Sequence, residues 1–175
     1  MLSVAGSVAI NTVAINTFAY IDDSSVDAYD DVTLDAVNNA FIGAGAGGIA
    51  LAFSSIARGD QTSVGVGIGI NVVRNDKNNG GTEAYIVDSD VDTDGRIIVN
   101  AETESTIMAV VAGFAFSNSG ISIQSNAYGI SLGVNVISTR TQASIRRKKS
   151  NGQYAGEGVY VTAADTSLIS AVSGA

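Results

Sequence analysis

Residues 66–72, Val-Gly-Ile-Gly-Ile-Asn-Val, alternate β-branched side chains with Gly or Asn. Residues 132–136, Leu-Gly-Val-Asn-Val, alternate in the same way. A period of two places successive side chains on opposite faces of a strand, whereas the same residues would wind around a helix without forming a stripe. β-branched residues also favour strands. Both stretches are therefore predicted to be half-buried strands, with their apolar side chains on the buried face.

Four segments recur along the chain with a period of about sixty residues. They are 7–11, 67–71 and 131–135; 19–21, 84–86 and 143–145; 32–36, 97–101 and 159–163; and 42–51 and 107–116, with a third copy that begins at Ile169. Turn-forming clusters at 22–25, 58–60, 75–81 and 150–152 separate these segments. We therefore divide residues 1–175 into three units of a single repetitive segment, about 3–62, 63–126 and 127–175. The third unit stops within the pattern, so we expect the chain to be a fragment of a longer array.

Two architectures suit such strands, a parallel solenoid and an antiparallel sandwich or barrel. In a solenoid each strand lies between its counterparts in adjacent coils, where proline cannot donate to the ladder. The chain contains no proline and no tryptophan, and one repeat unit cannot bury its own apolar face. These observations favour an all-β parallel β-helix or solenoid built from tandem repeats. Because a unit of about sixty residues exceeds a coil of about 20–30, each unit is expected to form two or three coils rising about 4.8 Å each.

The composition excludes several classes of function. His and Cys are absent, which rules out zinc fingers, disulfide frameworks, cysteine nucleophiles and histidine-based triads. A formal net charge of −8 argues against binding to phosphate backbones. Ser, Asn, Asp or Gly interrupts every apolar stretch well before the length of a membrane helix, and residues 1–6 lack the cationic start of a secretory signal. The chain is expected to bind no nucleic acid and to enter no membrane.

Enzymatic activity is not predicted. The plausible route on a solenoid is polysaccharide cleavage by paired acids. The adjacent acids at 22–23 and 30–31 would point to opposite faces of a strand. No acid recurs beside a basic partner at matching positions of the units.

Asn11, Asn71 and Asn135 occupy the same place in all three units. They could form a ligand-binding set of amides, or a ladder in which stacked side-chain amides bond along the axis as in cross-β assemblies. We favour the structural ladder. Residues 43–48, Gly-Ala-Gly-Ala-Gly-Gly, present almost no side chain. We interpret them as a strand packed closely against another element rather than a lateral association face, because unit two has larger residues there.

Residues 90–95, Asp-Val-Asp-Thr-Asp-Gly, match the opening of a calcium-binding loop. Asp90, Asp92 and Asp94 are therefore candidate calcium ligands. The twelfth position of such a loop is Ala101 instead of a bidentate Glu, which weakens the match. The alternative is an extended strand with Val91 in the core and a solvent-facing row of acids, which keeps a surface soluble. We favour the acidic row and expect no other cofactor.

Four of the nine cationic residues form the run Arg146-Arg147-Lys148-Lys149. Such a run could contact nucleic acid or anionic lipid. We favour a solvated turn that offsets the acidic turn one unit below.

The strings SVAIN (7–11), AYI (19–21), DVTLDA (31–36) and IGAGAGGIA (42–50) resemble a known family. They resemble the repetitive passenger regions of very large bacterial surface proteins, the leukotoxin-type filamentous adhesins and related autotransporter or two-partner-secreted haemagglutinin-like proteins. The resemblance implies a right-handed parallel β-helix stalk that is exported unfolded and folds outside the cell, without cofactor or catalytic residues. No functional residue is carried over, because the family pattern is structural.

The leading hypothesis is a structural stalk or filament segment of a bacterial cell-surface or secreted adhesin. Its expected partners are further copies of the repeat in cis, and a host or neighbouring cell reached through the parent protein. One alternative is a self-assembling extracellular fibre or matrix protein whose copies associate end to end or laterally. A calcium-dependent adhesion module is another. A lipid-facing wall in an outer membrane is a further alternative, although aromatic residues, 6% of the chain, are too sparse for interfacial girdles.

Overall fold

The computed structural model describes residues 2–54, 60–75, 80–119, 124–146 and 153–175. Within these ranges every helix or strand that is assigned is a strand. The strands are β1 (Leu2–Ala14), β2 (Thr17–Asp22), β3 (Ser25–Ala28), β4 (Val32–Ser54), β5 (Gln61–Arg74), β6 (Thr82–Val87), β7 (Asp90–Thr93), β8 (Arg96–Ser119), β9 (Ser125–Ser138), β10 (Thr141–Arg146), β11 (Gln153–Ala155), β12 (Gly158–Asp165) and β13 (Leu168–Gly174). The prediction of an all-β fold is confirmed.

The strands form four sheets, and every pairing in the described residues is parallel. Sheet A has the order β1-β5-β9, sheet B β2-β6-β10 and sheet C β3-β7-β11. In sheet D, β4 lies on one side of β8, while β12 and β13 lie in succession along its other side. The prediction of parallel sheets is confirmed, and the antiparallel alternative is wrong.

Strand partners are the residues that the sequence pattern aligned. Val8 pairs with Ile68, which pairs with Leu132, and Leu34 pairs with Val99. Paired residues are thus 59 to 65 positions apart in the sequence. Two or three coils per unit would pair residues only about 20–30 apart, so that expectation is wrong. The reason is strand length, because β4 and β8 take 23 and 24 residues and use up a large part of a unit in one pass.

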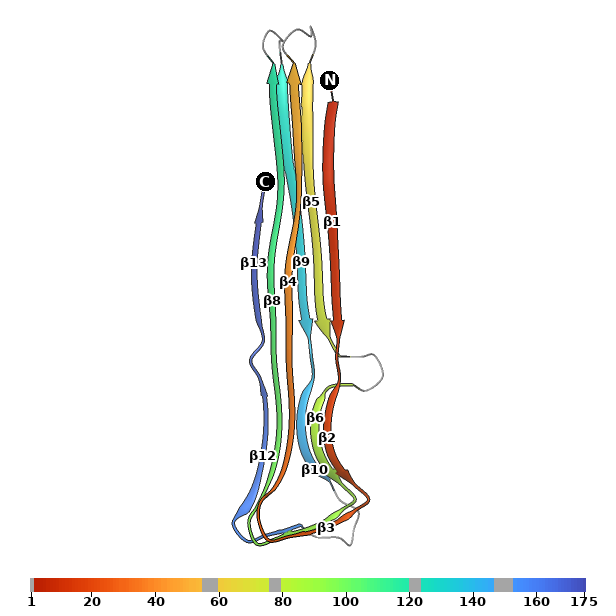
Figure 1. Ribbon diagram of the computed structural model, residues 1–175, viewed down its shortest axis with the longest axis vertical. Coiled ribbons are helices and arrows are strands. Elements are labelled where there is room, and N and C mark those ends of the chain that lie inside the picture. The colour runs from red at the N-terminus through yellow and green to blue at the C-terminus, as the bar shows by residue number, and fades with distance from the viewer. Residues whose placement is uncertain (1, 55–59, 76–79, 120–123, 147–152) are drawn as a thin grey trace.

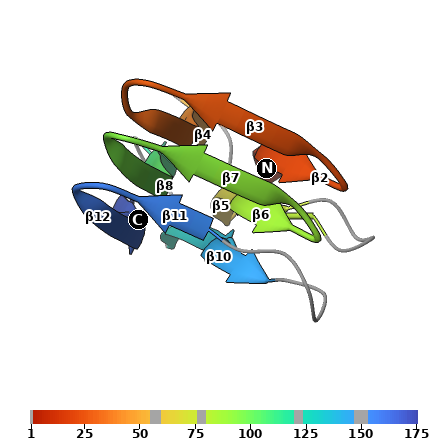
Figure 2. The same ribbon diagram turned by 90° about the horizontal axis from the view of Figure 1, so that it is seen from below.

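The molecule has a slender arm and a broad end (Figure 1). We define the arm as residues 2–14, 40–54, 61–73, 105–119, 125–138 and 168–174, where sheets A and D pack face to face. The broad end is residues 17–39, 80–104, 139–146 and 153–167, where sheets B and D separate. At the base of the broad end, β3, β7 and β11 cross from one side to the other in three stacked layers (Figure 2).

The hydrophobic core lies mainly in the broad end. Ile86, Val91 and Ile97 are fully buried there and belong to one cluster of apolar side chains. A smaller cluster around Ile42 and Ile107 lies where the arm begins. Burial of these side chains stabilises the packed sheets by roughly 1.5–3 kcal/mol for each large residue.

In the arm, the alternation is present but its orientation is the reverse of the prediction. Along β5 the buried positions include Gly67, Gly69 and Asn71, while Ile68 and Ile70 point outward. The prediction that the β-branched face of this strand is buried is therefore wrong. The small residues face inward because sheets A and D approach too closely for larger side chains between them.

Glycines mark this close approach. A Cβ atom on Gly65 would lie 2.0 Å from the carbonyl oxygen of Phe114, and one on Gly113 would lie 2.1 Å from that of Ile130. Gly48 in the Gly-Ala run shows the same crowding, whereas Gly45 points outward with no atom within 4 Å. The close-packing interpretation of residues 43–48 thus holds for the inward-facing positions of that run.

Two corners of the broad end have similar backbone geometry. Asp23 and Asp88 precede β3 and β7 with φ of 46° and 50°, in the left-handed region that Asp tolerates better than most residues. The Ser89 hydroxyl accepts a hydrogen bond from the backbone N–H of Ser24 at 3.2 Å. Of the other predicted turns, 58–59, 76–79 and 150–152 lie outside the described residues.

Candidate functional site

The three asparagines form a hydrogen-bonded row across β1, β5 and β9. The Nδ2 of Asn11 donates to Oδ1 of Asn71, and the Nδ2 of Asn71 donates to Oδ1 of Asn135, each at 2.8 Å. The Asn71 side chain is fully buried. A buried amide destabilises the fold unless it is hydrogen-bonded, and stacking of equivalent residues supplies each amide with a matching partner. The row therefore links the three strands of sheet A within the arm.

A second amide link lies on the outside of the broad end. The Nδ2 of Asn100 donates to Oδ1 of Asp35 at 2.8 Å, between adjacent residues of β8 and β4. This bond is exposed to solvent. It has the same length as the bonds of the buried row but is not buried. It therefore serves as an internal comparison for how much burial adds to the stability that such a hydrogen bond contributes.

The calcium candidates lie on and just after β7, which is extended. Val91 and Thr93 point into the core, and Asp90 and Asp92 point outward. Asp92 is in register with Asp27 of β3, so two carboxylates are neighbours on the outer face of sheet C. This is the solvent-facing acidic row that the sequence analysis favoured. Within the described residues, no group of three or more acidic side chains could hold a metal ion.

An ion pair joins the residue before β4 to the first residue of β8 at the base of sheet D. The Nη2 of Arg96 lies 2.6 Å from Oδ2 of Asp31, and the backbone N–H of Arg96 donates to Oδ1 of Asp31 at 2.8 Å. These hydrogen bonds hold the pKa of the Asp31 carboxyl below its ordinary value. The side chains are 47% and 32% exposed for Arg96 and Asp31. Solvent therefore screens the pair, and its contribution to stability is small.

Replacing Asp31 with Asn is expected to lower the melting temperature slightly, by on the order of 1 °C, at neutral pH. The folded-state pKa of Asp31 is depressed. Its contribution is therefore present above the unfolded pKa of about 3.9 and is lost as the pH falls through the folded value. Melting curves of both proteins from pH 7 to pH 2 measure the difference. A difference that grows as the pH falls would contradict this assignment.

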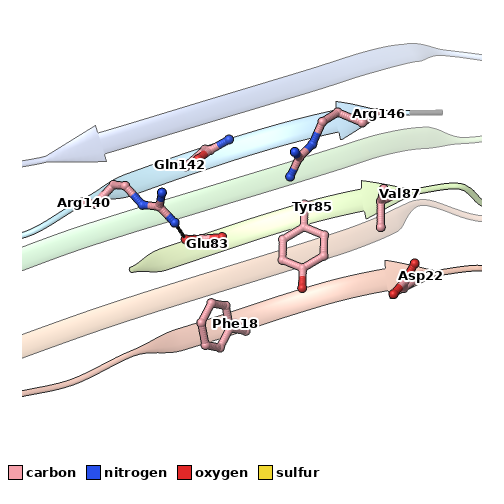
Figure 3. A pocket seen from close by; sticks show the side chains of 8 residues that line it. All are labelled: Phe18, Asp22, Glu83, Tyr85, Val87, Arg140, Gln142 and Arg146. Carbon is pink, nitrogen blue, oxygen red and sulfur yellow. Dashed lines mark hydrogen bonds and ion pairs between the residues drawn. The ribbon is translucent and has the colours of Figure 1, made fainter. Parts of the chain in front are cut away.

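A recess of about 500 Å³ lies on the outer face of sheet B (Figure 3). It is lined by Phe18, Asp22, Glu83, Tyr85, Val87, Arg140, Gln142 and Arg146. Arg140 and Glu83 form an ion pair across the recess. The Tyr85 ring stacks on Tyr20 of the neighbouring coil, with centroids 5.4 Å apart and an interplanar angle of 13°.

The recess offers hydrogen-bonding groups and an aromatic surface. Burial raises the pKa of Tyr85, and the negative charges of Glu83 and Asp22 add to this effect. The phenol is therefore protonated at neutral pH and can donate a hydrogen bond. Glu83 is held by Arg140, so both charges of the pair are partly neutralised. The chemistry of this surface is polar contact and stacking.

This recess was not predicted from the sequence. Tyr20 and Tyr85 occur at equivalent positions of the repeat, which was a usable signal for a stacked pair. Glu83 and Arg140 gave no such signal, because the register pairs Glu83 with Gln142 and not with Arg140. Of the predicted basic run, Arg146 ends β10 and borders the recess, while residues 147–149 lie outside the described residues.

The fold and these surfaces define an all-β protein of parallel, stacked strands. No protein-family model, no curated protein and no solved structure matches this chain. Among the described residues, no helix is long and apolar enough to cross a membrane.

Proposed function

We propose that the chain is a structural, non-catalytic segment of a bacterial cell-surface or secreted adhesin. In this proposal it is a right-handed parallel β-solenoid in which repeat units of about sixty residues stack along one axis. The parent protein would use the stacked coils to present a binding region to a host or neighbouring cell. The proposal requires no cofactor.

The stacking of successive strands in register supports this function. In sheet A, Asn11, Asn71 and Asn135 are direct neighbours although 60 and 64 residues separate them along the chain. Within the described residues, β1 to β4 pair on one side only, as do β9 to β13. Both ends of the stack therefore present strand edges that further copies of the same repeat can extend in cis.

The dimensions determine what such a segment can do mechanically. Each coil adds only about 4.8 Å along the stacking axis, whereas the 23 residues of β4 span about 75 Å across it. The stack is therefore a broad blade rather than a thin rod. Length is gained slowly, so a parent protein that reaches far from the cell needs many units, and each unit adds a wide lateral surface.

Antibodies raised against this chain are expected to label intact cells that make the protein. External protease should remove the label, because the proposal places the segment outside the cell. Immunofluorescence before and after permeabilisation measures this, with an antibody to a cytoplasmic enzyme as the control that labels only permeabilised cells. Labelling that appears only after permeabilisation would overturn the proposed location and function.

A further inference from the structure

The outer face of sheet A in the arm is apolar, and its charged residue, Arg74, lies where the arm meets the broad end. It has six rows of three residues, from Leu2–Thr62–Asn126 to Thr12–Val72–Val136. Large apolar side chains fill 14 of these 18 positions, among them Val64, Ile68, Ile70, Ile130 and Leu132. Even in the third coil, Ile130 and Leu132 remain 52% and 53% exposed. A patch of this kind is ordinarily covered by a partner.

We infer that this face packs against the same face of a second copy of the chain, sheet on sheet. The six rows of three strands cover about 14 Å by about 40 Å, or roughly 570 Å² on each copy. Two such faces bury roughly 1,100 Å² together, which reaches the lower limit for a specific interface. Each further coil widens the face by about 4.8 Å, so the contact grows with the number of units.

The shape and charge of the molecule indicate the relative orientation of the two copies. None of the residues that define the arm is Asp, Glu, Lys or Arg, whereas Asp22, Asp27 and Asp92 all lie in the broad end. The broad end also flares away from the arm (Figure 1). Antiparallel copies place each broad end beyond the tip of the other arm. This arrangement avoids a steric clash and keeps the two acidic ends farther apart than the screening length of about 8 Å.

One observation favours a protein over lipid as the partner of this face, and a second favours this face over that of sheet D. Strand β1 pairs only with β5 among the described strands, so its other edge has backbone groups that lipid would leave without hydrogen bonds. A second copy leaves that edge open to water or to another coil. The opposite face of the arm, on sheet D, is less suited to flat packing, because Gly43, Gly45 and Gly47 interrupt its large side chains.

Sedimentation of the purified chain tests the inference, with one variant in each face. The mass of the wild-type protein is expected to reach twice that of one chain as its concentration is raised to about 100 µM. The outward-facing substitution Ile68→Asp should weaken this association at least tenfold, and Val110→Asp, in the central strand of the sheet D face, should leave it unchanged. Wild type that stays monomeric, or a dimer lost in Val110→Asp and kept in Ile68→Asp, would overturn the inference.

Cross-linking provides a test that does not depend on the charged variant folding. The chain has no cysteine, so a mixture of Val66→Cys and Ile68→Cys, which face each other in the antiparallel arrangement, should form an intermolecular disulfide on oxidation, and Val110→Cys should not. A mixture of Val64→Cys and Ile70→Cys should cross-link mainly to each other if the copies are antiparallel, and to themselves if they are parallel. A parallel result would overturn the orientation. Wild type that remains monomeric in solution but co-sediments with phosphatidylcholine vesicles would assign the face to lipid and overturn the whole inference.

Discussion

Replacing Gly113 with Ala is expected to lower the free energy of unfolding by about 3 kcal/mol or more. An added Cβ would lie 2.1 Å from the carbonyl oxygen of Ile130 and 2.7 Å from that of Gly65. Both neighbours are backbone atoms of sheet A, so neither can rotate away. The two sheets would have to move apart along the arm, and this would weaken contacts in the neighbouring coils as well. Urea denaturation of the variant and wild type measures the loss.

The matched control is Gly45→Ala in the same sheet. Gly45 points outward and no atom lies within 4 Å of its Cβ position. Removing a glycine from a strand without a clash stabilises by about 0.4–1 kcal/mol. The two substitutions add the same methyl group and should shift stability in opposite directions. Equal effects at both positions would show that sheets A and D are not in close contact along the arm.

Replacing Asn71 with Ala is expected to lower the free energy of unfolding by about 2–3 kcal/mol. The variant loses both 2.8 Å hydrogen bonds of the buried row. It also leaves the Oδ1 of Asn135 and the Nδ2 of Asn11 without the partner that they have in the native stack. The small methyl group cannot replace them, and each unmatched polar atom adds its own desolvation cost.

The comparison variant for the row is Asn100→Ala. Asn100 donates a hydrogen bond of the same length, 2.8 Å, to the carboxylate of Asp35 on the exposed face of sheet D. Water replaces this bond when it is lost, so the change should stay within about 0.5 kcal/mol. If Asn100→Ala lowered the free energy of unfolding as much as Asn71→Ala, burial would not determine how much these side-chain hydrogen bonds contribute to stability.

Much of the strand pairing followed from sequence because the repeat aligned the correct residues. The match of 19–21 with 84–86 and 143–145 became the register of β2, β6 and β10. The alternation at 66–72 likewise predicted a strand. The number of coils per unit did not follow, because alternation does not reveal where a strand ends, and β4 continues for 23 residues through the Gly-Ala run.

The acidic stretch illustrates a site that sequence alone left open. Asp90, Asp92 and Asp94 have the spacing of a metal loop and also that of a strand face. The choice between them depends on whether the Val91 side chain lies in the hydrophobic core, and only the packing of the sheets decides that. The recess on sheet B was likewise hidden, because the contact between Glu83 and Arg140 depends on how two neighbouring strands present their side chains.

The amino-acid sequence by itself determined that the chain forms strands, that successive copies align and that three asparagines share one position, because all three properties are encoded in local alternation and repetition. Only the tertiary structure decided which face of each strand is inside. In the broad end the apolar side chains fill the core, whereas in the arm the glycines at 65 and 113 let two sheets come together until their backbones touch. Alternation specifies two faces but not the distance to the opposing sheet, and that distance determines which face the interior can hold.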